Sequence, residues 1–139
     1  MPTLTRWFIK SSLVFFVLAL LAGLLLAANV LWDLPPVFAA LGPVYFHLFL
    51  VGWVTQLIFG VVYWMFPKYS LGKPHGNEQL AWAVFWLLNL GLLLRVLGEP
   101  LNTLRPGGAW GWLLALSALL QWIAGLGFVF NTWGRVKEK

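Results

Sequence analysis

The chain has 139 residues, of which 61% are hydrophobic and only 9% are charged, and its formal net charge is +5. This composition excludes an ordinary soluble domain, because so few polar residues could not cover a water-exposed surface. The basic residues flank long apolar segments, so the positive charge indicates membrane topology, with lipid as the surrounding partner and no binding of nucleic acid. The sequence contains no cysteine, which excludes disulfides, thiolate metal sites and covalent attachment of haem through CxxCH.

Four apolar segments, each long enough to cross a bilayer as a helix, follow one another along the chain. The first is expected to be a retained helix and not a signal peptide, because no small-residue cleavage site follows it. Pro43 is expected to open the second helix. The sequence therefore predicts an all-α membrane protein with a single four-helix transmembrane domain over residues 1–139. The expected helices cover about residues 11–32, 44–66, 78–97 and 109–131, and the polar segments 68–78 and 98–108 are expected to be loops.

The distribution of Lys and Arg predicts the topology. Seven of the nine basic residues lie at positions that an even number of helices places on one side. By the positive-inside rule both termini are cytoplasmic, as expected for a multi-pass protein of the cell's inner (plasma) membrane. Only Arg95 and Arg105 lie on the outer side. The seven are Arg6, Lys10, Lys68, Lys73, Arg135, Lys137 and Lys139.

The second segment carries an imidazole, His47, near its outer end. A titratable side chain within a membrane span is costly and is therefore a candidate functional residue. If the segment is α-helical, Gln56 falls on the face opposite His47. Gln56 lies between Gly52 and Gly60 at four-residue spacing, which predicts close packing against another helix.

Two interpretations of His47 are open from the residues alone. The imidazole could simply bond to a carbonyl or a lipid phosphate, or it could bind haem iron or copper. The other histidine, His75, lies in a loop on the far side of the membrane and is expected to have no role. One chain therefore cannot supply two imidazoles to one metal, and a second copy would have to provide the other.

The pattern H-x4-G-W-x2-Q-x3-G-x2-Y-W-M-x-P, from His47 to Pro67, resembles the second transmembrane helix of haem-copper oxidase subunit I. It is most similar to the cytochrome cbb3 and nitric oxide reductase side of that superfamily. In the family this helix runs from the outer to the inner side, and the histidine near its outer end is an axial ligand of the low-spin haem. The resemblance implies a fold like one four-helix repeat of a subunit that contains three. The chain is therefore not expected to be a complete oxidase or reductase on its own.

The resemblance further implies a haem b, or less favourably copper, held through His47 between copies in a homo-oligomer, either a trimer or a dimer. Arg95 and Arg105 are candidates to bind the haem propionates, since guanidinium binds carboxylates bidentately. The alternative for Arg95 is an i, i+4 pair with Glu99. The implied function is electron transfer or binding of O2 or NO.

A second hypothesis is a cofactor-free accessory or assembly subunit that docks to a respiratory complex. A channel or small transporter is disfavoured, because no expected helix carries a polar stripe. The motifs of hydrolases, kinases and glycosidases are absent from the sequence.

Overall fold

The computed structural model describes residues 1–68 and 75–136, and every regular element in these ranges is a helix. Four spans are long and apolar enough to cross a membrane, which confirms the predicted fold class. The second span is divided into four consecutive pieces. In chain order the elements are α1 (Thr3–Leu31), α2 (Pro36–Ala39), α3 (Leu41–His47), the π-helix η1 (Leu48–Thr55), α4 (Gln56–Met65), α5 (Glu78–Leu104) and α6 (Ala109–Trp133).

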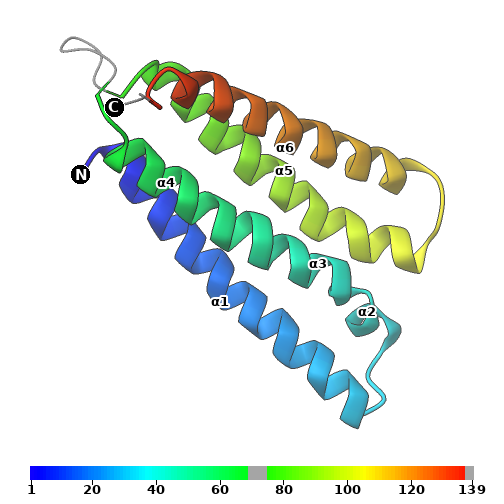
Figure 1. Cartoon of the computed structure of the whole chain (residues 1–139). Coiled ribbons are helices and arrows are strands. Elements are labelled where there is room, and N and C mark those ends of the chain that lie inside the picture. Colours follow the sequence, from blue (N-terminus) through cyan, green and yellow to red (C-terminus); the bar gives the residue numbers. More distant parts are fainter. Residues whose placement is uncertain (69–74, 137–139) are drawn as a thin grey trace.

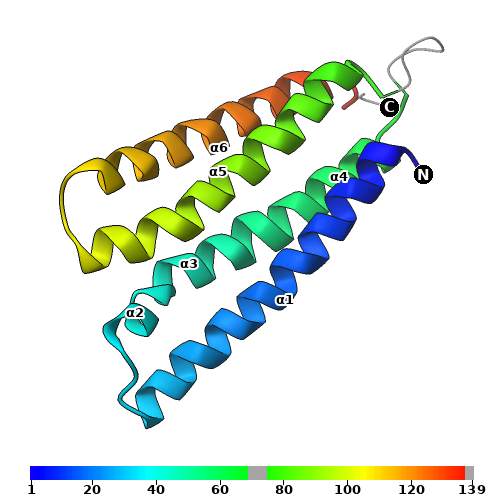
Figure 2. The same cartoon turned by 180° about the vertical axis from the view of Figure 1, so that it is seen from behind.

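The helices lie side by side in an open row and do not close into a bundle (Figures 1 and 2). The row runs from α1 through α3 and α4 to α5 and then α6, and both chain ends lie at the same end of the molecule. Helices α5 and α6 pack along most of their length, whereas α1 and α6 make no contact over their described residues. The fold is thus two helical hairpins joined side by side, with α1 and α6 at the free edges.

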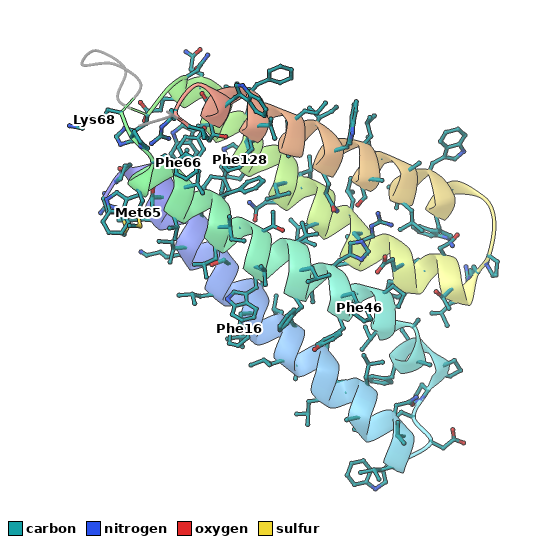
Figure 3. All side chains as sticks on the ribbon, viewed as in Figure 1. Phe16, Phe46, Met65, Phe66, Lys68 and Phe128 are labelled. Atoms are coloured by element: carbon teal, nitrogen blue, oxygen red, sulfur yellow. The ribbon has the colours of Figure 1, made fainter. Side chains whose placement is uncertain are left out.

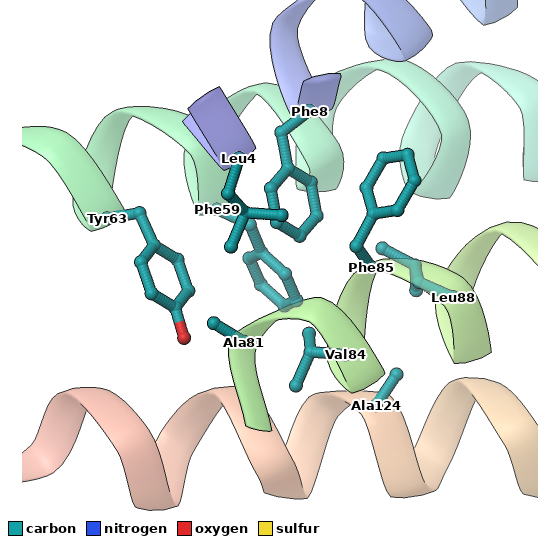
Figure 4. Packing of buried hydrophobic residues seen from close by; sticks show 9 residues of the cluster. All are labelled: Leu4, Phe8, Phe59, Tyr63, Ala81, Val84, Phe85, Leu88 and Ala124. Carbon is teal, nitrogen blue, oxygen red and sulfur yellow. The ribbon is translucent and has the colours of Figure 1, made fainter. Parts of the chain in front are cut away.

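The hairpins are packed together at the end that holds the termini by a hydrophobic cluster that contains several aromatic rings, shown in Figure 4. The ring of Phe8 packs edge-on against Phe59 and Phe85, and Phe59 stacks on Phe128 with ring centroids 3.7 Å apart. Edge-on and stacked contacts of this kind add to the dispersion energy that holds helices together in lipid. The nine buried members of the cluster are Leu4, Phe8, Phe59, Tyr63, Ala81, Val84, Phe85, Leu88 and Ala124.

Two glycines let the second span approach α1 closely, as their spacing predicted. A Cβ atom added at Gly52 would lie 2.8 Å from Cβ of Phe15, and one at Gly60 would lie 2.9 Å from Cβ of Phe8. Gln56, between them, is fully buried and donates a 3.0 Å hydrogen bond to Asn89 of α5. The face of small residues therefore packs on α1, and the amide bonds across to α5.

A polar network ties three helix ends together beside the termini, at the end of the molecule where Figure 3 labels Phe66 and Lys68. Arg135 is fully buried and donates to the carbonyls of Tyr63, Phe66 and Pro67 at 3.2, 2.7 and 3.0 Å. These carbonyls end α4 and would otherwise have no helical partner. The side chain of Asn131 bonds to both the backbone N–H and the carbonyl of Asn77, and to the hydroxyl of Tyr63.

The structure corrects several predicted boundaries. Helix α5 continues to Leu104, so the segment 98–104 is helical and was wrongly predicted as a loop. Pro100 lies inside this helix, as prolines can in membrane helices whose neighbours satisfy the freed backbone groups. Helix α1 begins at Thr3, before the expected residue 11, and Pro43 lies within α3 and does not open it. The predicted loop and tail at residues 69–74 and 137–139 lie outside the described part of the chain.

Candidate functional site

His47 is the last residue of α3 and directly precedes the π-helix η1. A π-helix makes i→i+5 hydrogen bonds, is rare, and often occurs at functional sites. Within η1 the hydroxyl of Thr55 donates a 2.8 Å bond to the carbonyl of Leu50, also five residues earlier. The imidazole is thus placed where the helical winding changes.

The change in winding explains why one prediction about His47 was wrong. A regular α-helix would put His47 and Gln56 on opposite faces, but in the structure both face α5, where His47 meets Glu99 and Gln56 meets Asn89. A π-helix winds more residues into each turn, so η1 rotates α4 relative to α3. Both polar side chains of the second span therefore point toward the same neighbouring helix.

The Nδ1 atom of His47 has one hydrogen-bond partner and one charged neighbour. It lies 2.9 Å from the carbonyl oxygen of Pro43, one turn earlier, and 3.2 Å from Oε1 of Glu99 in α5. Because a carbonyl oxygen can only accept a hydrogen bond, the proton must be on Nδ1. The Nε2 atom then carries the free lone pair that binds metals, and it makes no hydrogen bond within residues 1–68 and 75–136.

A guanidinium completes the cluster. Nη1 of Arg95 lies 3.6 Å from the same Oε1 of Glu99, which is the i, i+4 pair expected as the alternative role of Arg95. The carboxylate is largely buried, with 8% of the Glu99 side chain exposed, whereas 28% of the His47 side chain is exposed. Oε2 of Glu99 and Nε of Arg95 have no hydrogen-bond partner among the described residues. The cluster therefore links α3 to α5, and two of its polar atoms make no hydrogen bond to a described residue.

The donor set fits a haem better than a bare metal ion. Nowhere in the described ranges do three or more His, Cys, Asp or Glu side chains lie together so that they could hold a metal. A copper ion would need several ligands, whereas haem iron already has four from its ring and takes one imidazole on each side. A histidine ligand usually passes its other N–H to a carbonyl or carboxylate, and in His47 this N–H goes to the carbonyl of Pro43 with the carboxylate of Glu99 beside it. One chain offers one such ligand.

The other predicted site residues are placed differently. Arg95 belongs to the His47 cluster, whereas Arg105 is exposed at the end of α5 and forms no ion pair with a described residue. His75 lies near the termini. Burial is the main cause of its lowered pKa, and the charge of Arg135 is the next cause. The sequence interpretation treated Glu99 only as a partner of Arg95 and missed its contact with His47. The available signal was that Glu99 and His47 were both expected at the outer level of the membrane.

The fold and the cluster together define a multi-pass membrane protein with an oriented imidazole near one end of its second span. Over 58 residues the chain is 38% identical to cytochrome c oxidase subunit 1 of Thermus thermophilus. The match covers 40% of this chain and 53% of the relative, so the chain spans about half the length of the curated protein it matches. No family model and no solved structure matches. The similarity supports a relationship to haem-copper oxidases and to respiratory membrane proteins.

Proposed function

We propose that this protein is a haem-copper oxidase-related membrane protein that binds haem b between copies through Nε2 of His47. It would serve in electron transfer or in binding a small gas such as O2 or NO. The assembly is a homo-oligomer, a dimer or a trimer, because each chain supplies a single imidazole. Copper is the less favoured occupant.

The observation that carries the proposal is the anchoring of Nδ1 by Pro43 and Glu99 at 2.9 and 3.2 Å. This anchoring fixes the tautomer and limits rotation of the ring, so Nε2 is presented ready to coordinate. The partial similarity to a cytochrome c oxidase subunit 1 supports the same interpretation.

The arginines extend the proposal to the edge of the cofactor. Arg95 belongs to the same cluster as His47 and has an unpartnered, buried Nε, so a propionate would have to approach another part of its guanidinium while Nη1 stays near Glu99. Arg105, at the end of the same helix, would meet a second propionate. When bound, haem supplies a redox-active iron; the chain orients the imidazole and neutralises the charge of the propionates.

The direct test is the optical spectrum of the protein purified in detergent after expression with adequate haem. We expect a Soret band and sharp α and β bands on reduction, together with an intact oligomer by native mass measurement. The variant His47→Ala should lose these bands. The matched control His75→Ala, which removes the other histidine, should keep them.

A colourless wild-type oligomer, even after haem is added back, would overturn the proposal. Elemental analysis of the same sample distinguishes copper from iron. Bands of equal intensity in the His47→Ala and wild-type proteins would show that haem binds elsewhere and would equally refute the role of His47.

A second candidate function is a cofactor-free accessory subunit of a respiratory complex. It is favoured by the contiguous link that His47, Glu99 and Arg95 form between α3 and α5. It is also favoured by the outward side of α6, which carries exposed apolar residues such as Trp112 and Phe130. In that case the protein should copurify from native membranes with a haem-containing complex, and His47→Gln should leave the association unchanged.

A further inference from the structure

The side of α1 that faces α5 is hollowed by a cavity of about 500 Å³ near the termini. Its lining combines the basic residues Arg6 and Lys10 with the hydroxyl of Ser11, the ring of Trp7 and the amide of Asn89. Both basic side chains are exposed, and neither forms an ion pair with a described carboxylate. The cavity thus has a cationic, hydrogen-bonding mouth, and no function assigned above uses it.

A second cavity of about 200 Å³ continues from the first along the same side of α1. Phe15 lines both cavities, and every other residue of the second one is apolar. Its walls come from α1, α3, η1 and α5, represented by Leu18, Val44, Leu48 and Val96. The charged recess is therefore followed along α1 by an apolar channel, and Phe15 contributes to the walls of both.

The recess lies at the level of the lipid headgroups. Helix α1 has 29 residues and is therefore about 44 Å long, which exceeds the roughly 30 Å hydrocarbon core of a bilayer. Because Arg6 and Lys10 are charged and the residues after them are apolar, we place the first turns of α1 in the headgroup region. One leaflet of the core is about 15 Å deep, or roughly ten helical residues, so a chain that starts near Lys10 passes Phe15 and ends beyond Leu18.

We propose that the two cavities form one binding site for an anionic phospholipid. The phosphate pairs with Arg6 and Lys10, Ser11 can donate to it, and one acyl chain lies in the channel beyond Phe15. Basic pockets between transmembrane helices are suited to acidic lipid headgroups. A second copy of this chain is a poorer occupant of the site. The whole sequence has only four acidic residues, and these would have to offset the two charges here as well as the charges of the other basic residues. This site is independent of the proposed haem site.

The test compares retained lipid after reconstitution in nanodiscs of phosphatidylcholine mixed with phosphatidylglycerol, followed by purification and native mass spectrometry. The wild type should retain phosphatidylglycerol in preference to phosphatidylcholine. Lys10→Gln should weaken this retention about fivefold, as expected for one basic group at the membrane surface. The control Lys68→Gln removes an exposed charge outside both cavities and should retain lipid like the wild type.

A second pair of variants tests the apolar channel with all charges intact. Leu18→Trp fills the channel and should lower retention of the lipid, whereas Leu20→Trp, on an exposed position outside the lining, should not. Inorganic phosphate should not displace the lipid, because it lacks an acyl chain. The proposal would be overturned if Lys10→Gln retained as much phosphatidylglycerol as the wild type. It would also be overturned if the Lys10→Gln oligomer dissociated without losing lipid.

Discussion

At the scale of single residues, Glu99 decides what His47 can do. Its Oε1 lies between the imidazole and the guanidinium of Arg95, and almost none of the carboxylate is exposed. A carboxylate behind a ligating imidazole orients the ring and raises its basicity. Glu99 is therefore a positioning residue for the proposed haem, and it acts through His47.

We predict that Glu99→Gln lowers haem affinity by about 10- to 100-fold. The amide keeps an oxygen that can accept from Nδ1 but removes the negative charge, so the remaining bound haem should also have a more positive midpoint potential. Haem titration and potentiometry measure the two effects. Glu78→Gln, at the opposite end of α5, removes an exposed carboxylate and is the control. Loss of affinity with an unchanged potential would indicate a purely structural role for Glu99.

At the scale of the elements, the packing of the second span depends on glycine. The Cβ position of Gly52 is blocked from two sides, by Phe15 of α1 at 2.8 Å and by Cδ2 of Leu92 in α5 at 2.9 Å. Both neighbours are buried in one cluster, so they cannot move aside without disturbing each other. At this position α1, η1 and α5 lie close together.

Gly52→Ala should therefore destabilise the protein by about 1–3 kcal/mol, the usual cost of overpacking. Gly125→Ala is the matched control in α6, because nothing lies within 4 Å of its Cβ position. That change should be neutral or stabilise by up to about 1 kcal/mol, since alanine is the better helix former. Thermal unfolding in detergent compares the two, and a Gly52→Ala protein as stable as the wild type would contradict the packing.

Hydropathy and charge predicted the elements well, for clear physical reasons. A bilayer requires long apolar helices, so the four spans were evident, and the spacing of Gly52, Gln56 and Gly60 revealed a packing face. The end of α5 was not evident, because Gly98 and Pro100 look like loop residues and only neighbouring helices make them tolerable in a helix. The π-helix has no sequence signal of its own. The contact of His47 with Glu99 was missed because Glu99 lies in the segment that looked like a loop, although both residues were expected at the same level of the membrane.

At the scale of the whole molecule, Arg135 secures one end of the row of helices. Its guanidinium reaches three carbonyls at the end of α4 from a position just beyond α6, so it joins the two hairpins. The planar guanidinium of arginine carries N–H donors on three nitrogens and can bond to several carbonyls at once. The donors of lysine all lie on one nitrogen, so lysine is a poorer substitute here.

We expect Arg135→Gln to cost about 3 kcal/mol or more, because hydrogen bonds to a charged group contribute about 1.5–3 kcal/mol each and their buried acceptors would be left unpaired. Arg135→Lys should recover only part of the loss. Arg105→Gln, which changes an exposed arginine at the other end, should lie within about 0.5 kcal/mol of the wild type. Denaturant unfolding in detergent orders the three variants, and equal stability of Arg135→Gln and Arg105→Gln would contradict this role.

The division into two hairpins has a consequence for biogenesis. Each hairpin can enter the bilayer as a unit, but Gln56 and Asn89, like His47 and Glu99, then sit on separate units and face hydrocarbon without their partners. Lipid acyl chains contact an apolar helix surface as favourably as another helix does. The hydrophobic effect therefore contributes little to association of the two hairpins within the bilayer. These unmatched polar groups therefore favour docking after insertion, together with the aromatic packing between the hairpins.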